Sequence, residues 1–354
     1  MRAAVYHGPQ DIRPQEVPEP TVERGDVLLS VRAAGVCGTD VRIVKGEHAA
    51  YANGVGRIPG HEIVGRVEQS PDGGPPVGQI VFVAPNVGCG HCAQCRGGNE
   101  NLCPDTEALG ITLDGAFAER VVVPARAVAR GNLLPLGEEL SPAQQESAVL
   151  IEPLACVLRG QDKVGLGQGD TVVVAGGGPV GLLHVALARA RGASLVICSE
   201  PSAERRAAAL RAGAAVVVDP THEDVEAITA EATGGRGVDV AITAAPVHAL
   251  QASALRLAAS GGRVLFFGGL PKSRPTVELD TNLIHYKELL VAGTTASTLD
   301  DCRCAVELVT SGGIDLGWMV SDRHALADVA TAIARAQDPT ALKVVVLPAM
   351  KEGS

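Results

Sequence analysis

Residues 171–188 constrain the fold of this chain more than any other segment. They contain no Asp, Glu, Lys or Arg, and this uncharged segment is nearly as long as a membrane span. However, Gly-Gly-Gly-Pro at 176–179 interrupts the segment, and the β-branched run Thr-Val-Val-Val-Ala at 171–175 precedes that interruption. A buried parallel strand, a tight turn and a helix account for this pattern better than a membrane helix does.

The same alternation of strand and helix continues along the chain from about residue 155. Helix-like stretches rich in Ala, Leu and Arg separate the β-type runs, one ending near 191–192 and another covering 202–212. The expected strands are 171–175, 194–198, 215–219, 238–243 and 263–267. Repeated strand–helix units of this kind predict a doubly wound parallel sheet, so we expect an α/β protein.

The first 130 residues have a different texture, with short β-type runs between Gly and Pro residues. These runs cover 26–32, 63–68, 79–83 and 119–124 and indicate an antiparallel, barrel-like β domain. After about residue 290 we expect a helix around 299–311, a short stretch near Trp318, a helix around 325–336 and a strand at 342–347. At 354 residues, the chain is long enough for two domains with separate cores.

The glycines of the charge-free segment fit a dinucleotide-binding turn. Gly176, Gly178 and Gly181 match GxGxxG directly after a strand and directly before a helix, where the helix N-terminus points unpaired amides at phosphates. The predicted cofactor-binding set also includes Pro179, Val180, Glu200, Arg205, Gly268 and Gly269.

Glu200 decides the expected cofactor. It ends the next strand, where a carboxylate accepts hydrogen bonds from ribose hydroxyls and repels a 2′-phosphate, so we expect NAD rather than NADP. A solvated carboxylate at a strand end is the alternative. Arg205 or Arg206 could stack on the adenine or could instead bind that phosphate.

Four cysteines lie close together, at Cys89, Cys92, Cys95 and Cys103. Two CxxC steps and a fourth Cys after a short loop let four thiolates meet tetrahedrally, which is typical of structural zinc. A disulfide pair is disfavoured because no signal peptide begins the chain and the total of nine cysteines is odd. The spacing matches neither common ferredoxin run, which disfavours an iron–sulfur cluster.

The net charge limits which partners are expected, and the N-terminal residues indicate the expected compartment. The net charge of −10 and the absence of a Lys/Arg block disfavour nucleic acid and anionic membranes as partners. The first residues lack the apolar core of a signal peptide, so we expect a cytoplasmic protein.

A second group of metal-binding residue types is spread along the chain. Cys37 and His61 stand in short Gly-containing loops after β-type runs, Glu62 follows His61, and Glu152 stands at the junction of the two textures. One thiolate, one imidazole and a carboxylate form a catalytic type of zinc site with a position open for water or substrate.

Taken in order, these motifs make the chain resemble the zinc-dependent medium-chain alcohol and polyol dehydrogenases over nearly its full length. The matching pieces are Gly-Val-Cys-Gly-Thr-Asp at 35–40, Gly-His-Glu at 60–62, the cysteines at 89–103, Glu-Pro-Leu at 152–154 and the glycines at 176–181. The resemblance implies a GroES-like catalytic domain with a zinc lobe over 1–154, a Rossmann dinucleotide-binding domain over 155–290, and a return to the catalytic domain over 291–354.

The resemblance also implies roles for the second group. Cys37 and His61 would bind catalytic zinc, Glu62 and Glu152 compete for the third protein position, and Thr39 would take the hydroxyl proton. Many relatives carry a proton-relaying His three residues after that Thr. This chain has Arg42 there, which cannot relay a proton at neutral pH, so either His48 or the ribose hydroxyls and water would replace it.

The implied enzyme is an NAD-dependent oxidoreductase acting on a secondary alcohol, with one catalytic and one structural zinc. Glu152, where the ethanol enzymes have Cys, and the segments 267–272 and 282–288 resemble the sorbitol and L-iditol 2-dehydrogenase branch. An amino-alcohol such as threonine or an inosamine, inositol, or a simple secondary alcohol remains an alternative substrate. A zinc-free reductase and a non-enzymatic nucleotide-binding protein are disfavoured by the complete catalytic set. We expect a homodimer or homotetramer.

Overall fold

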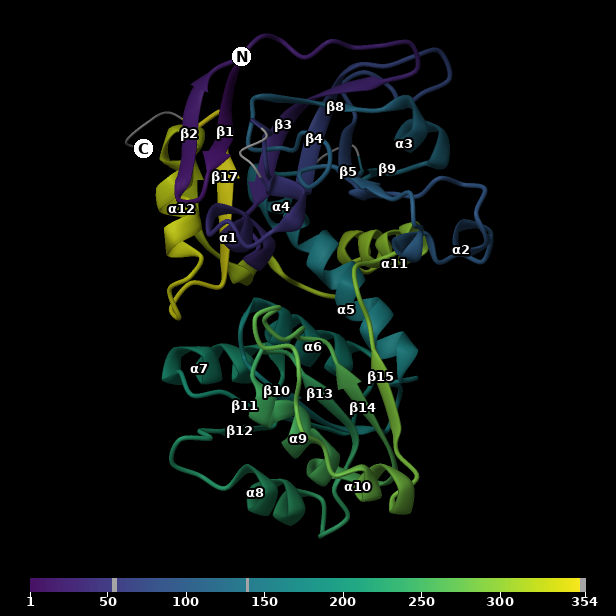
Figure 1. Cartoon of the computed structure of the whole chain (residues 1–354), viewed down its shortest axis with the longest axis vertical. Coiled ribbons are helices and arrows are strands. Elements are labelled where there is room, and N and C mark those ends of the chain that lie inside the picture. The colour runs from purple at the N-terminus through teal and green to yellow at the C-terminus, as the bar shows by residue number, and fades with distance from the viewer. Residues whose placement is uncertain (53–55, 138–139, 351–354) are drawn as a thin grey trace. The chain divides into compact units, whose positions relative to one another are not determined.

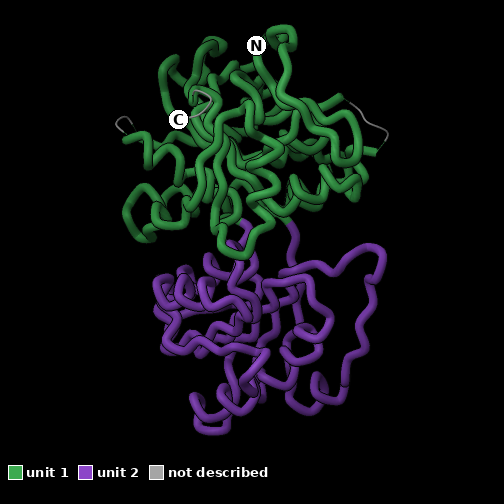
Figure 2. Tube along the Cα trace, turned by 90° about the vertical axis from the view of Figure 1, so that its left-hand side faces the viewer, with its two compact units in different colours: residues 1–155, 296–354 green, residues 156–295 purple. Residues whose placement is uncertain are grey.

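The computed structural model describes residues 1–52, 56–137 and 140–350 and divides into two compact units. One unit comprises Met1–Ala155 together with Ala296–Ser354, and the other comprises Cys156–Thr295 (Figure 2). Helix α5, Ile151–Lys163, begins in the first unit and ends in the second.

The second unit is built on a six-stranded sheet in the order β12-β11-β10-β13-β14-β15, in which every neighbouring pair is parallel (Figure 1). The strands are β10 Thr171–Ala175, β11 Leu195–Ser199, β12 Val216–Val218, β13 Val238–Thr243, β14 Ala258–Phe266 and β15 Leu290–Gly293. The helices are α6 Pro179–Ala190, α7 Ala203–Ala212, α8 Val225–Ala232, α9 His248–Leu257 and α10 Thr281–Tyr286.

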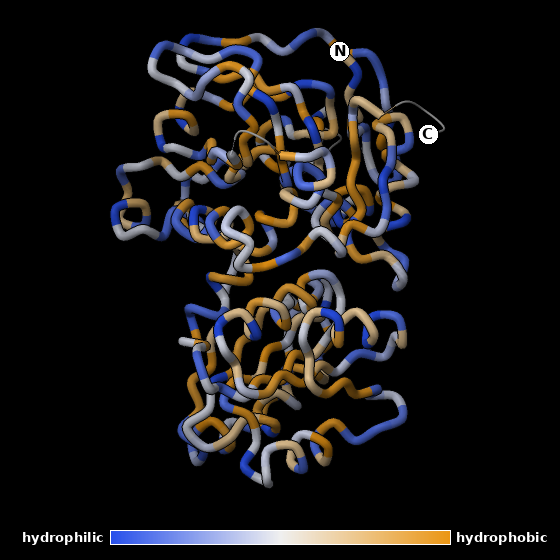
Figure 3. The backbone as a smooth tube through the Cα atoms, turned by 180° about the vertical axis from the view of Figure 1, so that it is seen from behind, coloured by the Kyte–Doolittle hydropathy of each residue, from blue (hydrophilic) through white to orange (hydrophobic). Residues whose placement is uncertain are grey.

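This order confirms the predicted doubly wound sheet, and β10 and α6 replace the apparent membrane span. None of the helices in the described part of the chain is long and apolar enough to cross a membrane. The central strands consist mostly of hydrophobic residues, as the colouring in Figure 3 shows. Their Val, Ile, Leu and Ala side chains are buried and form the core. Strand β14 begins five residues before the predicted start at 263, because Ala258 pairs with Val238 ahead of a register shift.

The first unit contains a seven-stranded sheet in the order β16-β17-β3-β4-β5-β9, with β8 paired to β3. Its strands are β3 Val27–Gly35, β4 Glu62–Gln69, β5 Ile80–Val83, β8 Arg120–Val123, β9 Leu133–Pro135, β16 Val320–Ala325 and β17 Lys343–Leu347. Two small antiparallel pairs, β1 Arg2–Gly8 with β2 Asp11–Glu16 and β6 Asn86–Val87 with β7 Glu107–Ala108, accompany it.

All pairs in the large sheet are antiparallel except β16 with β17, which confirms the predicted antiparallel domain. The C-terminal segment joins this sheet through β17, which pairs with β3. Strands β1, β2, β6, β7, β9 and β16 were not predicted. The sequence of β2, Asp-Ile-Arg-Pro-Gln-Glu, has no apolar alternation, and only its Ile12 is buried.

Short helices connect the strands of the first unit. The α-helices are α1 Gly38–Val44, α2 Ala93–Arg96, α3 Ala125–Arg130, α4 Pro142–Ser147, α11 Leu299–Thr310 and α12 Val329–Arg335. The 3₁₀ helices are η1 Ala49–Tyr51, η2 Glu100–Leu102, η3 Ala148–Leu150, η4 Gly317–Met319 and η5 Leu326–Asp328. The helix expected around 325–336 is therefore η5 followed by α12.

Candidate active site and cofactor sites

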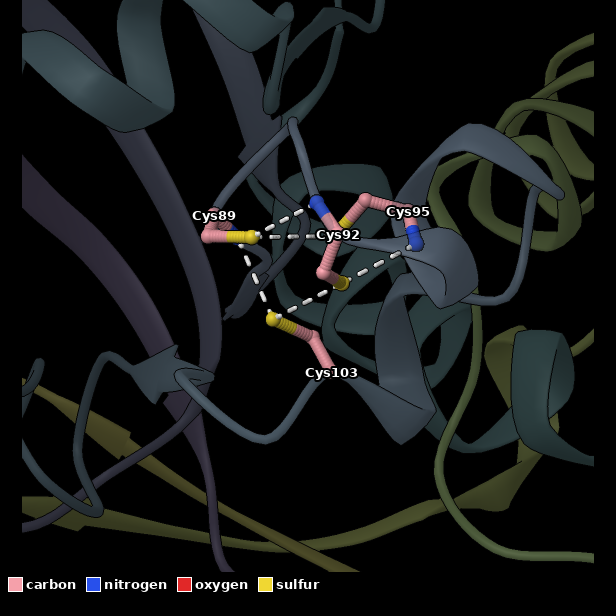
Figure 4. Close-up of side chains that lie close together, drawn as sticks. All are labelled: Cys89, Cys92, Cys95 and Cys103. Carbon is pink, nitrogen blue, oxygen red and sulfur yellow. Dashed lines mark hydrogen bonds between the residues drawn. The ribbon is translucent and has the colours of Figure 1, made fainter.

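The four clustered cysteines converge on one point. Their sulfur atoms lie within 4.8 Å of one another, with Cys89 Sγ 3.9 Å from Cys95 Sγ and Cys92 Sγ 3.7 Å from Cys103 Sγ (Figure 4). Tetrahedral zinc with four Zn–S bonds of about 2.3 Å places its sulfurs about 3.8 Å apart. The arrangement therefore fits a closed structural zinc site.

Backbone N–H groups donate hydrogen bonds to three of these four sulfurs. The N–H groups of Cys92 and Cys95 donate to the sulfurs of Cys89 and Cys92, both over 3.3–3.4 Å. The N–H of Cys89 donates to Cys103 Sγ over 3.3 Å and lowers the pKa of the Cys103 thiol to about 6. Cys92 also caps α2, so the turn that presents the ligands is fixed by its own hydrogen bonds.

Cys37, His61 and Glu62 form a second convergent group, in which one ligand atom from each lies within 4.8 Å of the others. Cys37 is the N-cap of α1, and Glu62 is the first residue of β4. Gly60, with φ of +98°, turns the chain into His61, and a Cβ there would lie 2.9 Å from the Phe117 ring. A thiolate, an imidazole and a carboxylate in this arrangement fit a zinc ion with an open position.

Asp40 lies against two members of this group, a contact that we did not predict. It is fully buried; its Oδ2 accepts from the Cys37 N–H over 2.8 Å, and its Oδ1 lies 3.8 Å from His61 Nδ1. With Nδ1 turned to a carboxylate, His61 can present Nε2 to a metal. Burial lowers the pKa of His61, but the charges of Asp40 and Cys37 outweigh it and hold this pKa well above its ordinary value.

Lys343 is a second residue that sequence reasoning missed. Its Nζ donates to both carboxylate oxygens of Glu62 over 2.7 Å and also lies 3.4 Å from the Val36 carbonyl oxygen. Glu62 is fully buried and only 4% of the Lys343 side chain is exposed, so the pair is shielded from water. Burial lowers the pKa of Lys343, but the charges of Glu62, Cys37 and Glu152 together outweigh burial and raise this pKa. The signal in the sequence was a Lys inside the apolar run at 342–347.

Glu152 lies near this group but outside it. It stands in the first turn of α5, is buried, and its charge acts on both His61 and Lys343. Within the described residues, the set of mutually close ligand atoms includes Glu62 and not Glu152.

Thr39 and Arg42 lie one helical turn apart on α1. Arg42 Nη2 donates to Thr39 Oγ1 over 3.2 Å, so the hydroxyl oxygen that we expect to meet the substrate already has a cationic neighbour. His48, the alternative relay residue, instead caps η1 by accepting from the Ala50 N–H through Nδ1.

The glycine-rich turn of the second unit links β10 to α6. Gly176 has a φ of +108°, and a Cβ at Gly181 would collide with the Gly176 carbonyl oxygen. Gly178 is the N-cap of α6 and Pro179 its first residue, so the helix N-terminus faces this turn. Because these glycines have no side chains, a pyrophosphate can come close to the backbone of the loop.

Glu200 closes this loop from the end of β11. Its Oε2 accepts from the Gly177 N–H over 2.7 Å and its Oε1 from the Ser202 N–H over 3.0 Å. Arg206 Nη1 donates to the Glu200 carbonyl oxygen over 2.8 Å and pairs with Asp219. Of the two arginines considered for the cofactor, Arg205 is the one beside Gly178. Gly268 packs against the backbone of Ala245, whereas a Cβ at Gly269 would meet open space.

Comparison with known proteins identifies relatives of both units. Residues 23–135 match the alcohol dehydrogenase GroES-like domain, and residues 179–311 match the zinc-binding dehydrogenase domain. L-threonine 3-dehydrogenase of Pyrococcus abyssi is 36% identical over 316 residues, covering 87% of each chain. Sorbitol dehydrogenase of Bacillus subtilis is 33% identical, covering 98% of this chain and 97% of that one.

A solved structure shows the same fold. The zinc-binding dehydrogenase of Sinorhizobium meliloti bound to NADP superposes with a TM-score of 0.89 at 35% identity, covering 98% of this chain and 99% of that one. The similarity thus extends over both units and over both candidate metal sites.

Proposed function

Since this chain belongs to the family of zinc-dependent medium-chain alcohol and polyol dehydrogenases, we propose that it transfers a hydride between a secondary alcohol of a polyol or sugar-like substrate and NAD. The observation that carries this proposal is the convergence of Cys37, His61 and Glu62 ligand atoms within 4.8 Å. When bound there, zinc would polarise the alcohol oxygen and lower the pKa of the hydroxyl, as it does for water.

The neighbouring residues would hold this site and move the proton. Asp40 accepts a hydrogen bond from the Cys37 N–H, which fixes the Cys37 loop, and places a carboxylate oxygen 3.8 Å from His61 Nδ1. Thr39 Oγ1 accepts one hydrogen bond from Arg42, so its second lone pair can accept the proton of the substrate hydroxyl. The Thr39 hydroxyl would then pass its own proton outward. Arg42 has no acceptor, so it cannot take the proton itself.

The third protein position on the metal belongs to Glu62 or Glu152. Glu62 is favoured because its ligand atom lies close to those of Cys37 and His61. Glu152 is favoured because both oxygens of Glu62 already accept hydrogen bonds from Lys343. Glu62→Gln and Glu152→Gln decide between them. If a variant loses its catalytic zinc when a chelator is added, the residue replaced in it is the zinc ligand. The other variant should then keep zinc and show an altered pH profile. Retention of zinc and full activity by both variants would contradict both assignments.

For the cofactors, we propose structural zinc at the four clustered cysteines and NAD at the glycine-rich turn. Glu200 supports NAD, because its buried carboxylate lies against the Gly177 N–H, where a 2′-phosphate would meet a negative charge.

A second candidate function is oxidation of an amino-alcohol such as threonine, which the identity to L-threonine 3-dehydrogenase favours. We also propose a cytoplasmic homodimer or homotetramer. The odd total of nine cysteines supports a reducing compartment. The exposed Leu290 on β15, at the edge of the sheet, supports contact with a second copy.

The direct test mixes zinc-loaded protein and NAD with sorbitol, iditol, inositol, threonine and butane-2,3-diol and follows NADH absorbance. We expect oxidation of at least one secondary alcohol. Thr39→Val should lower kcat by on the order of a hundredfold, and the control Thr39→Ser should keep most of it because the hydroxyl remains. Bound NAD without NADH formation from any alcohol would contradict the proposal.

A further inference from the structure

Arg42 is a guanidinium at the candidate active site with no anionic partner. Its Nη2 lies 3.2 Å from Thr39 Oγ1, and across the described residues no carboxylate oxygen lies within 4.0 Å of its side-chain nitrogens. Asp40, the nearest acid in sequence on α1, is turned inward to the Cys37 N–H and His61. Arg42 is exposed, so its remaining N–H groups can reach a ligand.

Two other cations of this unit are already committed. Lys343 is bound to both oxygens of Glu62, and Arg57 donates to the carbonyl oxygens of Ala50 and Ile111. With a net charge of −10, the chain as a whole repels anions. An anionic substrate would therefore depend on a local cation, and Arg42 is placed to supply it.

The distance from Arg42 to the reacting carbon limits where a substrate anion can be. A hydroxyl hydrogen-bonded to Thr39 Oγ1 would lie about 2.8 Å from it, so the Arg42 nitrogen would be within about 6 Å of that hydroxyl. Each carbon–carbon bond spans about 1.5 Å, so an acid group a few carbons from the reacting carbon falls within this reach.

We propose that Arg42 binds a carboxylate of the substrate and thereby makes a hydroxy acid, rather than a neutral polyol, the preferred substrate. The planar guanidinium fork matches the two oxygens of a carboxylate and is charged at every physiological pH. This inference rests on the proposed function, since it narrows the substrate class of the same site. The hydroxy acid could be a sugar acid or a hydroxy amino acid, because both offer the same group.

Matched substrate pairs test this inference on the zinc-loaded enzyme with NAD. Gluconate with sorbitol, galactonate with galactitol, and threonine with 3-aminobutan-2-ol differ within each pair by the presence of the carboxylate. We expect kcat/KM to favour the acid in at least one pair by roughly 10- to 100-fold, the range of a hydrogen bond to a charged group. The productive pair distinguishes a sugar acid from an amino acid.

Substitutions on helix α1 test whether Arg42 causes the preference for the acid. Arg42→Gln should lower kcat/KM for the acid at least tenfold more than for its neutral partner, mainly through KM, and Arg42→Lys should lose less. Lys45→Gln is the matched control, because it removes one exposed positive charge at the end of the same helix. It should leave the acid-to-neutral ratio within about threefold, as expected for a screened surface charge.

The possible failures are distinguishable. Equal use of acid and neutral alcohols, or an equal loss for both in Arg42→Gln, would overturn the carboxylate assignment while leaving a dehydrogenase. The absence of NADH from every alcohol would remove the proposed function and this inference with it.

Discussion

Replacing Lys343 with Met should destabilise the protein strongly. Lys343 Nζ lies 2.7 Å from both Glu62 oxygens, in a pair whose side chains are 4% and 0% exposed. At this distance, and with an effective dielectric constant of about 20, two unit charges attract by about 6 kcal/mol. Removing one partner of a buried pair costs about 3–5 kcal/mol, because the other charge stays buried without compensation. We therefore expect the free energy of unfolding to fall by about 3–5 kcal/mol.

Urea denaturation of the metal-free protein, followed by circular dichroism, measures this loss. The double variant Glu62→Gln/Lys343→Met should recover about 2 kcal/mol relative to Lys343→Met, because no unpaired charge remains. Lys163→Met, at an exposed position, should stay within about 0.5 kcal/mol of the wild type. Saturating zinc should recover part of the loss in Lys343→Met by compensating Glu62. A loss below about 1 kcal/mol with no coupling in the double variant would refute the buried-pair reasoning.

Three further predictions concern other parts of the chain. Cys95→Ser should lower zinc content by about one ion per chain and lower the Tm; unchanged zinc and Tm would refute the structural site. Glu200→Ala should raise the NADP-to-NAD ratio of kcat/KM, whereas a wild type that prefers NADP would refute the role of Glu200. Burial lowers the pKa of His184 to about 3, so between about pH 3 and pH 6.5 only the unfolded state binds a proton there, and stability falls as the pH is lowered through this range. From pH 7 to 5, His184→Gln should therefore lose about 2 kcal/mol less than the wild type; equal losses would refute this linkage.

Sequence reasoning worked where the determinants of structure are local. The β-branched run at 171–175 and the glycines that follow it predict β10, the turn and α6, because neighbouring residues alone decide each of them. The convergence of the four cysteines was predictable for the same reason, since they lie within fifteen residues.

Interactions between distant residues were out of reach of the sequence pattern. The pair formed by Glu62 and Lys343 joins residues 281 positions apart, and a lone Lys in a strand does not name its partner. Asp40 belongs to a recognisable motif, yet its contact with His61 depends on how α1 meets the start of β4. Strand β2 was missed because pairing with β1, rather than its own polar sequence, makes it extended.

The zinc content of Cys37→Ala, measured by inductively coupled plasma mass spectrometry beside turnover and NAD affinity, tests the central claim most directly. We expect two zinc ions per wild-type chain and one in the variant. We also expect loss of turnover and unchanged NAD affinity, because Cys37 and the glycine-rich turn belong to different units. Two zinc ions in Cys37→Ala, or turnover like that of the wild type, would contradict the catalytic zinc site.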